Sequence, residues 1–415
     1  MRKLAFLFLT AVLVTIPASA DMVTDWNAVA SQTIVTNAGR PPAASVVDFV
    51  YVNAAMYDAV NSIDGRFEPY AVRSASASPA ASEEAAAATA AYRILRTFFP
   101  SQSPYLDSQY AASIATVSDG YAKTQGIIVG EEAALGLLAA RAGDGRNDPS
   151  RVYVYGSGPG EYQPTPPAFA SFQTPWVAFM KPFAMERASQ FRAERPPALS
   201  SDEWADDYNE TKTFGALNST ARTPEQTEIG RFYTEHTGAQ YNRILRNFAL
   251  SQNLSLADDA RLFAQVYVSV GDAVIAVWDS KYFYRRWRPV TAIRAGDTDG
   301  NRDTDADPAW TPLAVTPGHA EYPAAHGSFT GAFAQALEEF FGTRKLTITL
   351  TSTVTGTSRT FNRTTDLVKE IIVARIYGGM HFRTSCVQGK VMGEKVAKLV
   401  SKHYFQPANN DEQDR

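Results

Sequence analysis

Three short basic motifs between residues 281 and 381 constrain this chain more than any other feature of its sequence. Together they contain three permanent cations and three imidazoles: Lys281, Arg288, Arg375, His319, His326 and His381. Almost no carboxylates lie within the motifs. Ionised donors bind anionic oxygens strongly, and imidazole titrates near neutral pH. We therefore predict that the fold brings the three motifs to one pocket for a tetrahedral oxyanion.

The first twenty residues have the pattern of a signal peptide. Arg2 and Lys3 precede an apolar run over 4–16, and Ala18-Ser-Ala20 is a small-residue cleavage site before Asp21. The apolar run is short for a membrane span. We expect export to the periplasm or the medium after cleavage near Ala20.

The composition excludes some partners and leaves a large core available. The formal net charge of −4 gives no reason to expect nucleic acid as a partner. With 45% hydrophobic residues in 415, the chain can form one large domain or two fused units. Cys386 is the only cysteine, so no disulfide can form within the chain, and we expect it to be buried and apolar. No later stretch resembles a membrane segment.

Most of the chain has the apolar periodicity of helices. The fold class that this predicts is all-α. Start and stop signals include Ser45, Gly65 and a capping pattern from Ser255 to Asp258. The predicted helices span 45–63, 78–99, 103–118, 124–142, 202–217, 224–235, 240–250, 255–287, 328–341, 365–377 and 387–403.

Three segments break this pattern. Residues 143–200 are rich in proline, glycine and aromatic residues, which predicts a long ordered loop rather than a flexible linker. It could cover the mouth of a site or only wrap the surface. Residues 294–310 form an acidic loop, and alternating apolar residues near 346–361 predict a small β-hairpin turning near Gly356.

The first motif places Lys281 and Arg288 seven residues apart. On a helix both side chains would project from one face, and Pro289 would then end that helix. The alternative is a solvated basic stripe that also contains Arg285 and Arg286.

The second motif places His326 just before an apolar helix. The free N–H groups at a helix N-terminus favour anions and lower the pKa of a nearby imidazole, so His326 could act as a neutral base. A histidine that only packs at the helix end is the alternative. His319 lies seven residues earlier in a loop, where spacing alone does not fix its direction.

The third motif places Arg375 and His381 six residues apart, about 240° apart on an unbroken helix. Gly378-Gly379 can break the helix and turn His381 back towards Arg375. A glycine pair is also an ordinary helix end.

The remaining candidates are weaker. The acidic stretch from Asp297 to Asp307 misses the spacing of a calcium-binding EF-hand loop, so we expect a solvated loop. His236 and His403 have no partner pattern in the sequence.

In this order the motifs Lys-x6-Arg-Pro, Pro-x-x-His and Arg-x5-His resemble the vanadium-dependent haloperoxidase and type 2 phosphatidic acid phosphatase superfamily. The resemblance rests on residues 278–385. It implies a single helical-bundle domain over 21–407, followed by a polar tail at 408–415.

The resemblance also implies roles. Lys281, Arg288 and Arg375 would bind the oxygens of vanadate, or of phosphate in the same site. His381 would be the metal ligand, or the nucleophile of a phosphatase. The other implied roles are acid–base catalysis by His326, a backbone N–H donor at Ala325 and an aromatic wall at Trp278. The expected substrates are hydrogen peroxide with a halide or a small organic molecule.

Three positions depart from the family pattern. Ala324 replaces a serine and so offers no hydroxyl group. Ser385 replaces the aspartate that orients the metal-binding histidine, which argues against strong phosphatase turnover. Ala374 replaces a serine before Arg375.

His319 resembles the second histidine of bromoperoxidases, where chloroperoxidases carry an aromatic residue. This resemblance predicts that bromide or iodide is oxidised in preference to chloride, with His319 sharing in proton transfer. A residue that only caps its loop is the alternative. Two other functions stay open: an exported acid phosphatase with a phosphohistidine intermediate, and a non-catalytic oxyanion-binding protein.

Overall fold

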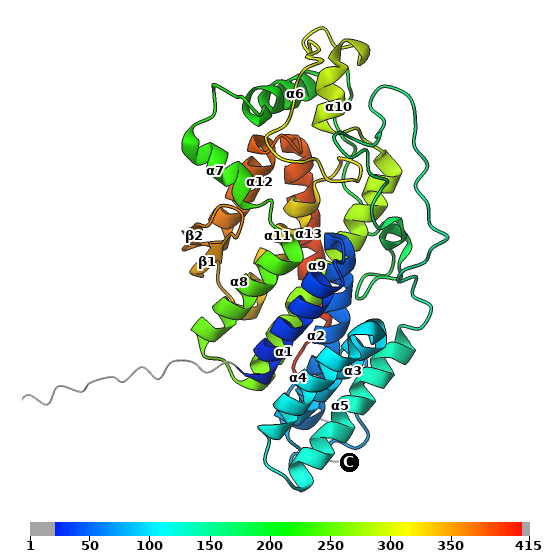
Figure 1. Ribbon diagram of the computed structural model, residues 1–415, viewed down its shortest axis with the longest axis vertical. Coiled ribbons are helices and arrows are strands. Elements are labelled where there is room, and N and C mark those ends of the chain that lie inside the picture. Colours follow the sequence, from blue (N-terminus) through cyan, green and yellow to red (C-terminus); the bar gives the residue numbers. More distant parts are fainter. Residues whose placement is uncertain (1–20, 409–415) are drawn as a thin grey trace, which may run out of the picture.

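The computed structural model describes residues 21–408, and these form a helical molecule with one two-stranded sheet (Figure 1). The predicted signal peptide and residues 409–415 of the predicted tail lie outside the described residues. The first helices are α1 (Met22–Ser31), α2 (Pro42–Asp64), α3 (Glu83–Phe98), α4 (Ser103–Ala115), α5 (Tyr121–Ala140), α6 (Asp202–Gly215) and α7 (Pro224–Phe232). The later elements are α8 (Thr237–Gln252), α9 (Leu256–Tyr284), α10 (Pro289–Arg294), α11 (Ala325–Phe341), β1 (Ile348–Thr351), β2 (Ser358–Phe361), α12 (Thr364–Tyr377) and α13 (Arg383–His403). The all-α expectation is confirmed.

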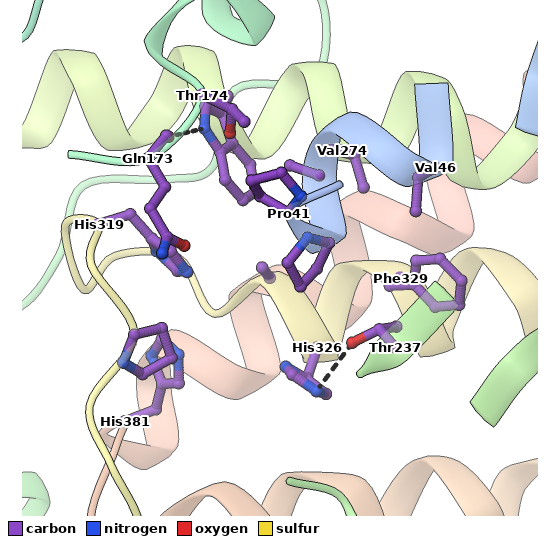
Figure 2. A pocket seen from close by; sticks show the side chains of 15 residues that line it. Pro41, Val46, Gln173, Thr174, Thr237, Val274, His319, His326, Phe329 and His381 are labelled. Atoms are coloured by element: carbon purple, nitrogen blue, oxygen red, sulfur yellow. Dashed lines mark hydrogen bonds between the residues drawn. The ribbon is translucent and has the colours of Figure 1, made fainter. Parts of the chain in front are cut away.

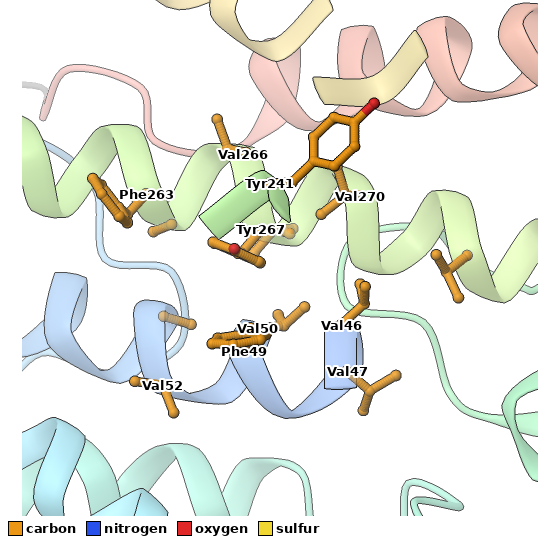
Figure 3. Packing of buried hydrophobic residues seen from close by; sticks show 14 of the residues in the cluster. Val46, Val47, Phe49, Val50, Val52, Tyr241, Phe263, Val266, Tyr267 and Val270 are labelled. Atoms are coloured by element: carbon orange, nitrogen blue, oxygen red, sulfur yellow. The ribbon is translucent and has the colours of Figure 1, made fainter. Parts of the chain in front are cut away.

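Helix α9 is the central element of the bundle. It packs against α2, α11 and α13, and Figure 3 shows its apolar side chains meeting those of α2. The Phe49 and Tyr267 rings lie 5.4 Å apart between these two helices. By length and composition α9 could cross a membrane, but 94% of its most apolar 18-residue window is buried inside the molecule. Its apolar character is therefore that of a core helix.

Most predicted helices are present, with shifts at their ends. The alanine-rich helix begins at Glu83, because the Ser82 side chain caps it, and not at Ser78. Gly65 ends α2 with a φ of 73°, as predicted. Helix α13 begins four residues earlier than predicted. Helices α1 and α10 were not predicted from the sequence.

The end of α9 differs from the prediction. The helix ends at Tyr284, and not near Trp287, because Arg285 adopts a left-handed conformation with a φ of 53°. The chain then pairs with a strand-like segment of the long loop. Tyr162 N donates to Arg285 O at 2.7 Å, and Trp287 N donates to Gly160 O at 2.9 Å.

The prediction that Lys281 and Arg288 share one helix face is wrong for this reason. Pro289 does not end α9 but begins α10, and Arg288 is the N-cap residue of α10. Proline fits the first turn of a helix because its missing N–H would have no partner there. Arg288 therefore approaches the bundle from an extended segment.

The two non-helical predictions of ordered structure are confirmed. Strands β1 and β2 pair antiparallel, with Ile348 opposite Phe361. The loop over 143–200 packs closely on α9. The buried Asp272 carboxylate accepts three backbone hydrogen bonds, from the N–H groups of residues 183, 184 and 185, at 2.6–2.8 Å. Those bonds tie the middle of the loop to the central helix.

Helices α11 and α13 cross at glycines. A Cβ at Gly327 would lie 2.5 Å from Cys386 O, and one at Gly331 would lie 2.6 Å from Lys390 O. On α13, a Cβ at Gly389 would overlap the carbonyl of Ala324, the N-cap residue of α11, and a Cβ at Gly393 would overlap the carbonyl of Ser328 within α11. The two backbones can approach this closely only because these positions lack side chains. This crossing matters for the site, because His326 lies in the first turn of α11 and His381 lies just before α13.

We predict that Gly393→Ala destabilises the protein by about 1–3 kcal/mol, because the added methyl group forces the two helices apart. The free energy of unfolding in denaturant measures this. Gly158→Ala is the matched control. Its nearest contact would be Glu161 Oε2 at 3.5 Å, so we expect a change within about 0.5 kcal/mol. Equal losses in both variants would contradict the close crossing.

Candidate active site

The structure brings the three basic motifs together. Lys281, Arg288 and Arg375 are all buried, with 0–1% of each side chain exposed. Arg288 connects the motifs directly. Its Nη1 donates to His381 Nε2 at 3.0 Å, and its Nη2 lies 3.0 Å from His319 Nδ1. Residues from α9, the extended segment before α10, the loop before α11, the end of α12 and the turn that follows it thus share one site.

The three buried cations lack carboxylate partners. Among residues 21–408, no aspartate or glutamate forms a salt bridge with any of them. Arg375 Nε is buried without a hydrogen-bond partner in the same part of the chain. Burial lowers the pKa of Arg288 and of Arg375 to about 10, and burial together with Arg288 lowers the pKa of Lys281. Such a cluster is electrostatically suited to an anion.

Lys281 holds a loop in this structure. Its Nζ donates to the carbonyl oxygens of Ala320, Glu321 and Pro323 at 2.7, 2.8 and 2.6 Å. These three bonds use all three ammonium protons. Lys281 would therefore support anion binding through its charge and by holding the loop before α11 in place.

The glycine pair turns His381 as predicted. Helix α12 ends at Tyr377, and Gly379 adopts a φ of 71°. Arg375 stays in the last turn of α12. Its Nη1 donates to Tyr233 O at 3.0 Å, and its Nη2 lies 3.0 Å from Met380 Sδ. His381 follows the turn and faces Arg288.

Glu321 is a site residue that sequence reasoning missed. Its Oε1 lies 2.8 Å from His381 Nδ1, and it also accepts from Phe382 N at 3.2 Å. Burial raises the pKa of Glu321 to about 7, while the Lys281 and Arg288 charges oppose that rise. The sequence carried a signal, because Glu321 is a lone carboxylate inside a basic motif. In the family pattern an aspartate at position 385 orients the metal-binding histidine. Here Glu321, in the loop before α11, makes a hydrogen bond of that kind to His381.

His326 is the second residue of α11, close to where the sequence placed it. Its Nε2 lies 3.3 Å from Thr237 Oγ1, the first residue of α8 (Figure 2). Burial, followed by the Arg375 charge, lowers the pKa of His326 well below its usual value. The ring is therefore neutral near pH 7 and can accept a proton. Thr237 was not singled out in the sequence, where only its place at a helix start was visible.

His319 lies between Arg288 and an aromatic wall. Its ring centroid is 5.0 Å from that of Trp278, and burial lowers its pKa well below the usual value. Ala325 begins α11, so its backbone is helical and its N–H lacks an intrahelical partner. Ala324 is fully buried beneath it, against α13.

A cleft of about 630 Å³, including its open mouth, leads to the three histidines (Figure 2). Its walls are mainly apolar, from the start of α2, from α9 and from α11. The lining includes Pro41, Val46, Gln173, Val274, Trp278 and Phe329. Gln173 belongs to the long loop, so part of that loop borders the site.

The weaker candidates do not join the site. The Asp299 carboxylate in the acidic loop is satisfied by Trp204 Nε1, Asn301 N and the Thr304 hydroxyl. Within residues 21–408, no group of three or more acidic, histidine or cysteine side chains is placed to hold a metal ion. His236 bonds to Arg40 O, and Cys386 is buried. His403 is exposed in the last turn of α13.

Comparisons with known proteins identify relatives of this chain by sequence and by fold. A family model described as the VCPO second helical-bundle domain matches residues 261–410. The vanadium chloroperoxidase of Curvularia inaequalis is 27% identical over 210 residues, which cover 42% of this chain and 34% of that protein. The match thus spans about a third of that relative's length.

Two solved structures show the same fold. The first bacterial vanadium-dependent iodoperoxidase superposes with a TM-score of 0.79 at 21% identity, covering 94% of this chain and 99% of that one. A holo-type bacterial vanadium-dependent chloroperoxidase superposes with a TM-score of 0.69 at 18% identity, covering 94% and 98%.

We predict that Arg375→Met weakens anion binding without lowering the stability of the protein. Without phosphate, the free energy of unfolding should stay equal or rise by up to about 2 kcal/mol, because an unpaired buried charge is removed. Inorganic phosphate should raise the melting temperature of the unaltered protein, because it binds only the folded state. The variant should lose most of that rise.

Arg363→Met is the matched control, because Arg363 is exposed at the other end of α12. It should keep the full response to phosphate. A normal phosphate response in Arg375→Met would contradict the assignment of Arg375 to the anion site.

Proposed function

We propose that this chain, which belongs to the vanadium haloperoxidase superfamily, is an exported vanadate-dependent haloperoxidase that oxidises bromide or iodide with hydrogen peroxide. The observation that carries the proposal is the set of three buried, unpaired cations around His381. Among residues 21–408 no aspartate or glutamate forms a salt bridge with these cations, and the one carboxylate close enough to act on Lys281 and Arg288 is that of Glu321. An oxyanion such as vanadate would supply the missing negative charge. The net reaction is H₂O₂ + X⁻ + H⁺ → HOX + H₂O.

The residues present fit vanadate. His381 Nε2 has a lone pair, because the Arg288 guanidinium facing it can only donate. Arg288, Arg375 and the Ala325 N–H would hold the oxygens, and His381 would be the metal ligand. When bound, vanadium supplies Lewis acidity that activates peroxide towards halide. Arg288 would exchange its bond to His381 for bonds to the oxyanion.

His326 has the properties of the proton carrier. Its neutral ring can accept a proton from hydrogen peroxide and return one to the departing water. Thr237 holds one ring nitrogen and so limits rotation of the imidazole. The low pKa keeps the neutral form present below the usual histidine range, so the base is available in mildly acidic solution.

The cleft supports a role for small organic acceptors. It lacks lysine, arginine, aspartate and glutamate side chains in its lining, and the three histidines at its floor are neutral near pH 7. A neutral, largely apolar molecule would fit it better than an ion. Such a molecule would meet hypohalous acid before the oxidant escapes to solvent.

An exported acid phosphatase is a second candidate, favoured by the bond between Glu321 and His381 Nδ1. That bond leaves Nε2 free to attack phosphorus, and the same cations would stabilise the transition state. The loss of aspartate at position 385 therefore does not argue against this activity.

The two functions differ in their response to vanadate. We predict that the purified protein oxidises bromide and iodide only after vanadate is added, and that His381→Ala lowers vanadate affinity more than about 100-fold. Metal analysis, triiodide formation and hydrolysis of a generic phosphate ester measure these effects. Efficient ester hydrolysis that vanadate only inhibits would favour the phosphatase.

A further prediction concerns His319 and halide choice. Bromide oxidation should exceed chloride oxidation, and His319→Phe should change the ratio of the two kcat/KM values about 2- to 10-fold and shift the pH profile. That range corresponds to one hydrogen bond of about 0.5–1.5 kcal/mol. His403→Phe, at an exposed site, is the control. An unchanged ratio and profile in His319→Phe would make His319 structural.

A further inference from the structure

We propose that Glu321 is the positioning residue that fixes the tautomer of His381, and that position 385 is a second place from which a carboxylate can do the same. This inference rests on the proposed function, because it specifies how the metal-binding nitrogen is prepared. It assigns a role to two residues on separate elements. Glu321 lies in the loop before α11, and Ser385 lies in the first turn of α13.

The hydrogen bonds of His381 determine which nitrogen carries the proton. Arg288 Nη1 lies 3.0 Å from Nε2, and a guanidinium has donors only. Nε2 must therefore accept, so the proton of the neutral ring is on Nδ1. Nδ1 donates this proton to Glu321 Oε1 at 2.8 Å. The outcome is a lone pair on Nε2, which both metal ligation and nucleophilic attack require.

Glu321 is held from several directions. Its backbone N donates to Arg286 O at 2.9 Å, and its carbonyl accepts from Lys281 Nζ at 2.8 Å. Its Oε1 also accepts from Phe382 N at 3.2 Å. With 2% of the residue exposed, the carboxylate cannot turn to water. A fixed acceptor selects the ring orientation as well as the tautomer.

Ser385 lies beside this carboxylate. The residue is 1% exposed, and its buried hydroxyl faces the Glu321 carboxylate, where it helps to lower the pKa of that group against the effect of burial. Ser385 and Glu321 line one small pocket behind His381, together with Trp204, Trp287 and Phe382. A carboxylate at position 385 would thus enter the same pocket, four residues after His381. Asp207 and Arg286 also line this pocket. With Glu321 still present, a carboxylate at position 385 would add a further negative charge beside those of Glu321 and Asp207, which burial disfavours.

This geometry predicts an exchange between the two positions. Glu321→Gln should bind vanadate about 10- to 100-fold more weakly, as expected when the partner of a metal-binding histidine is lost. Ser385→Asp alone should bring no gain. The double variant Glu321→Gln/Ser385→Asp should recover at least about tenfold of the lost affinity, because one carboxylate is again present.

The first test needs neither a variant nor vanadate. Nitrogen-15 NMR of the vanadate-free protein should show His381 as the Nδ1-protonated tautomer. The Nε2-protonated tautomer in the unaltered protein would overturn the inference. This readout is independent of halide oxidation, so it separates a failure of this inference from a failure of the proposed function.

The second test compares two anions by calorimetry across the four proteins. His381 Nε2 would hold vanadate together with the cations, whereas the cations alone would hold inorganic phosphate. Glu321→Gln should therefore lower the affinity for vanadate strongly and the affinity for phosphate less than about threefold. Melting curves should show that each variant is folded. Glu186→Gln, at an exposed site, is the control and should leave both affinities unchanged.

Two results of the second test would overturn the inference. Equal losses for vanadate and phosphate would show that Glu321 only supports the fold, and a double variant without recovery would show that position 385 cannot replace it. An unaltered protein that binds phosphate but not vanadate would instead count against the proposed function, while the NMR result would still decide the tautomer.

Discussion

The desolvation of three cations is the constraint on which the rest of the structure depends. Buried charges that form no salt bridge need hydrogen-bond partners within the protein. Here those partners are backbone carbonyl oxygens. Lys281 binds three of them in the loop before α11, Arg288 binds those of His319 and Met380, and Arg375 binds that of Tyr233. Lys281 and Arg288 therefore fix the segments that carry His319 and His381. Neutral donors would bind these carbonyls more weakly than the three cations do.

The helical bundle supplies what the loops cannot, which is a fixed separation between His326 and His381. His326 depends on the start of α11, and His381 depends on the turn into α13. The glycine crossing between α11 and α13 sets the distance between these two helix ends. Because interiors are packed densely, a shift of this crossing would move both imidazoles relative to the cations. The fold and the site are linked through this single contact region.

The sequence predicted local features well and contacts between distant residues poorly. Periodicity and capping residues located most helices, and Gly378-Gly379 correctly predicted the turn before His381. Arg288 was misplaced because a left-handed arginine at position 285 has no sequence signature, and pairing with residues 160–162 was invisible. Glu321 and Thr237 were missed as partners because they contact histidines 60 and 89 positions away. Such contacts arise only when separate elements pack together.

The departures from the family motifs show why position in a motif and role in a site are different properties. Ser385 removes a carboxylate from one helix, yet Glu321 places a carboxylate on the same imidazole from a loop. His326 likewise has its hydrogen-bond partner on another element, because the Thr237 hydroxyl reaches it from α8. The chemistry of a neutral imidazole requires an acceptor on one nitrogen and is indifferent to which element provides it. A substitution in a motif can therefore be judged only against the atoms that reach the site in three dimensions.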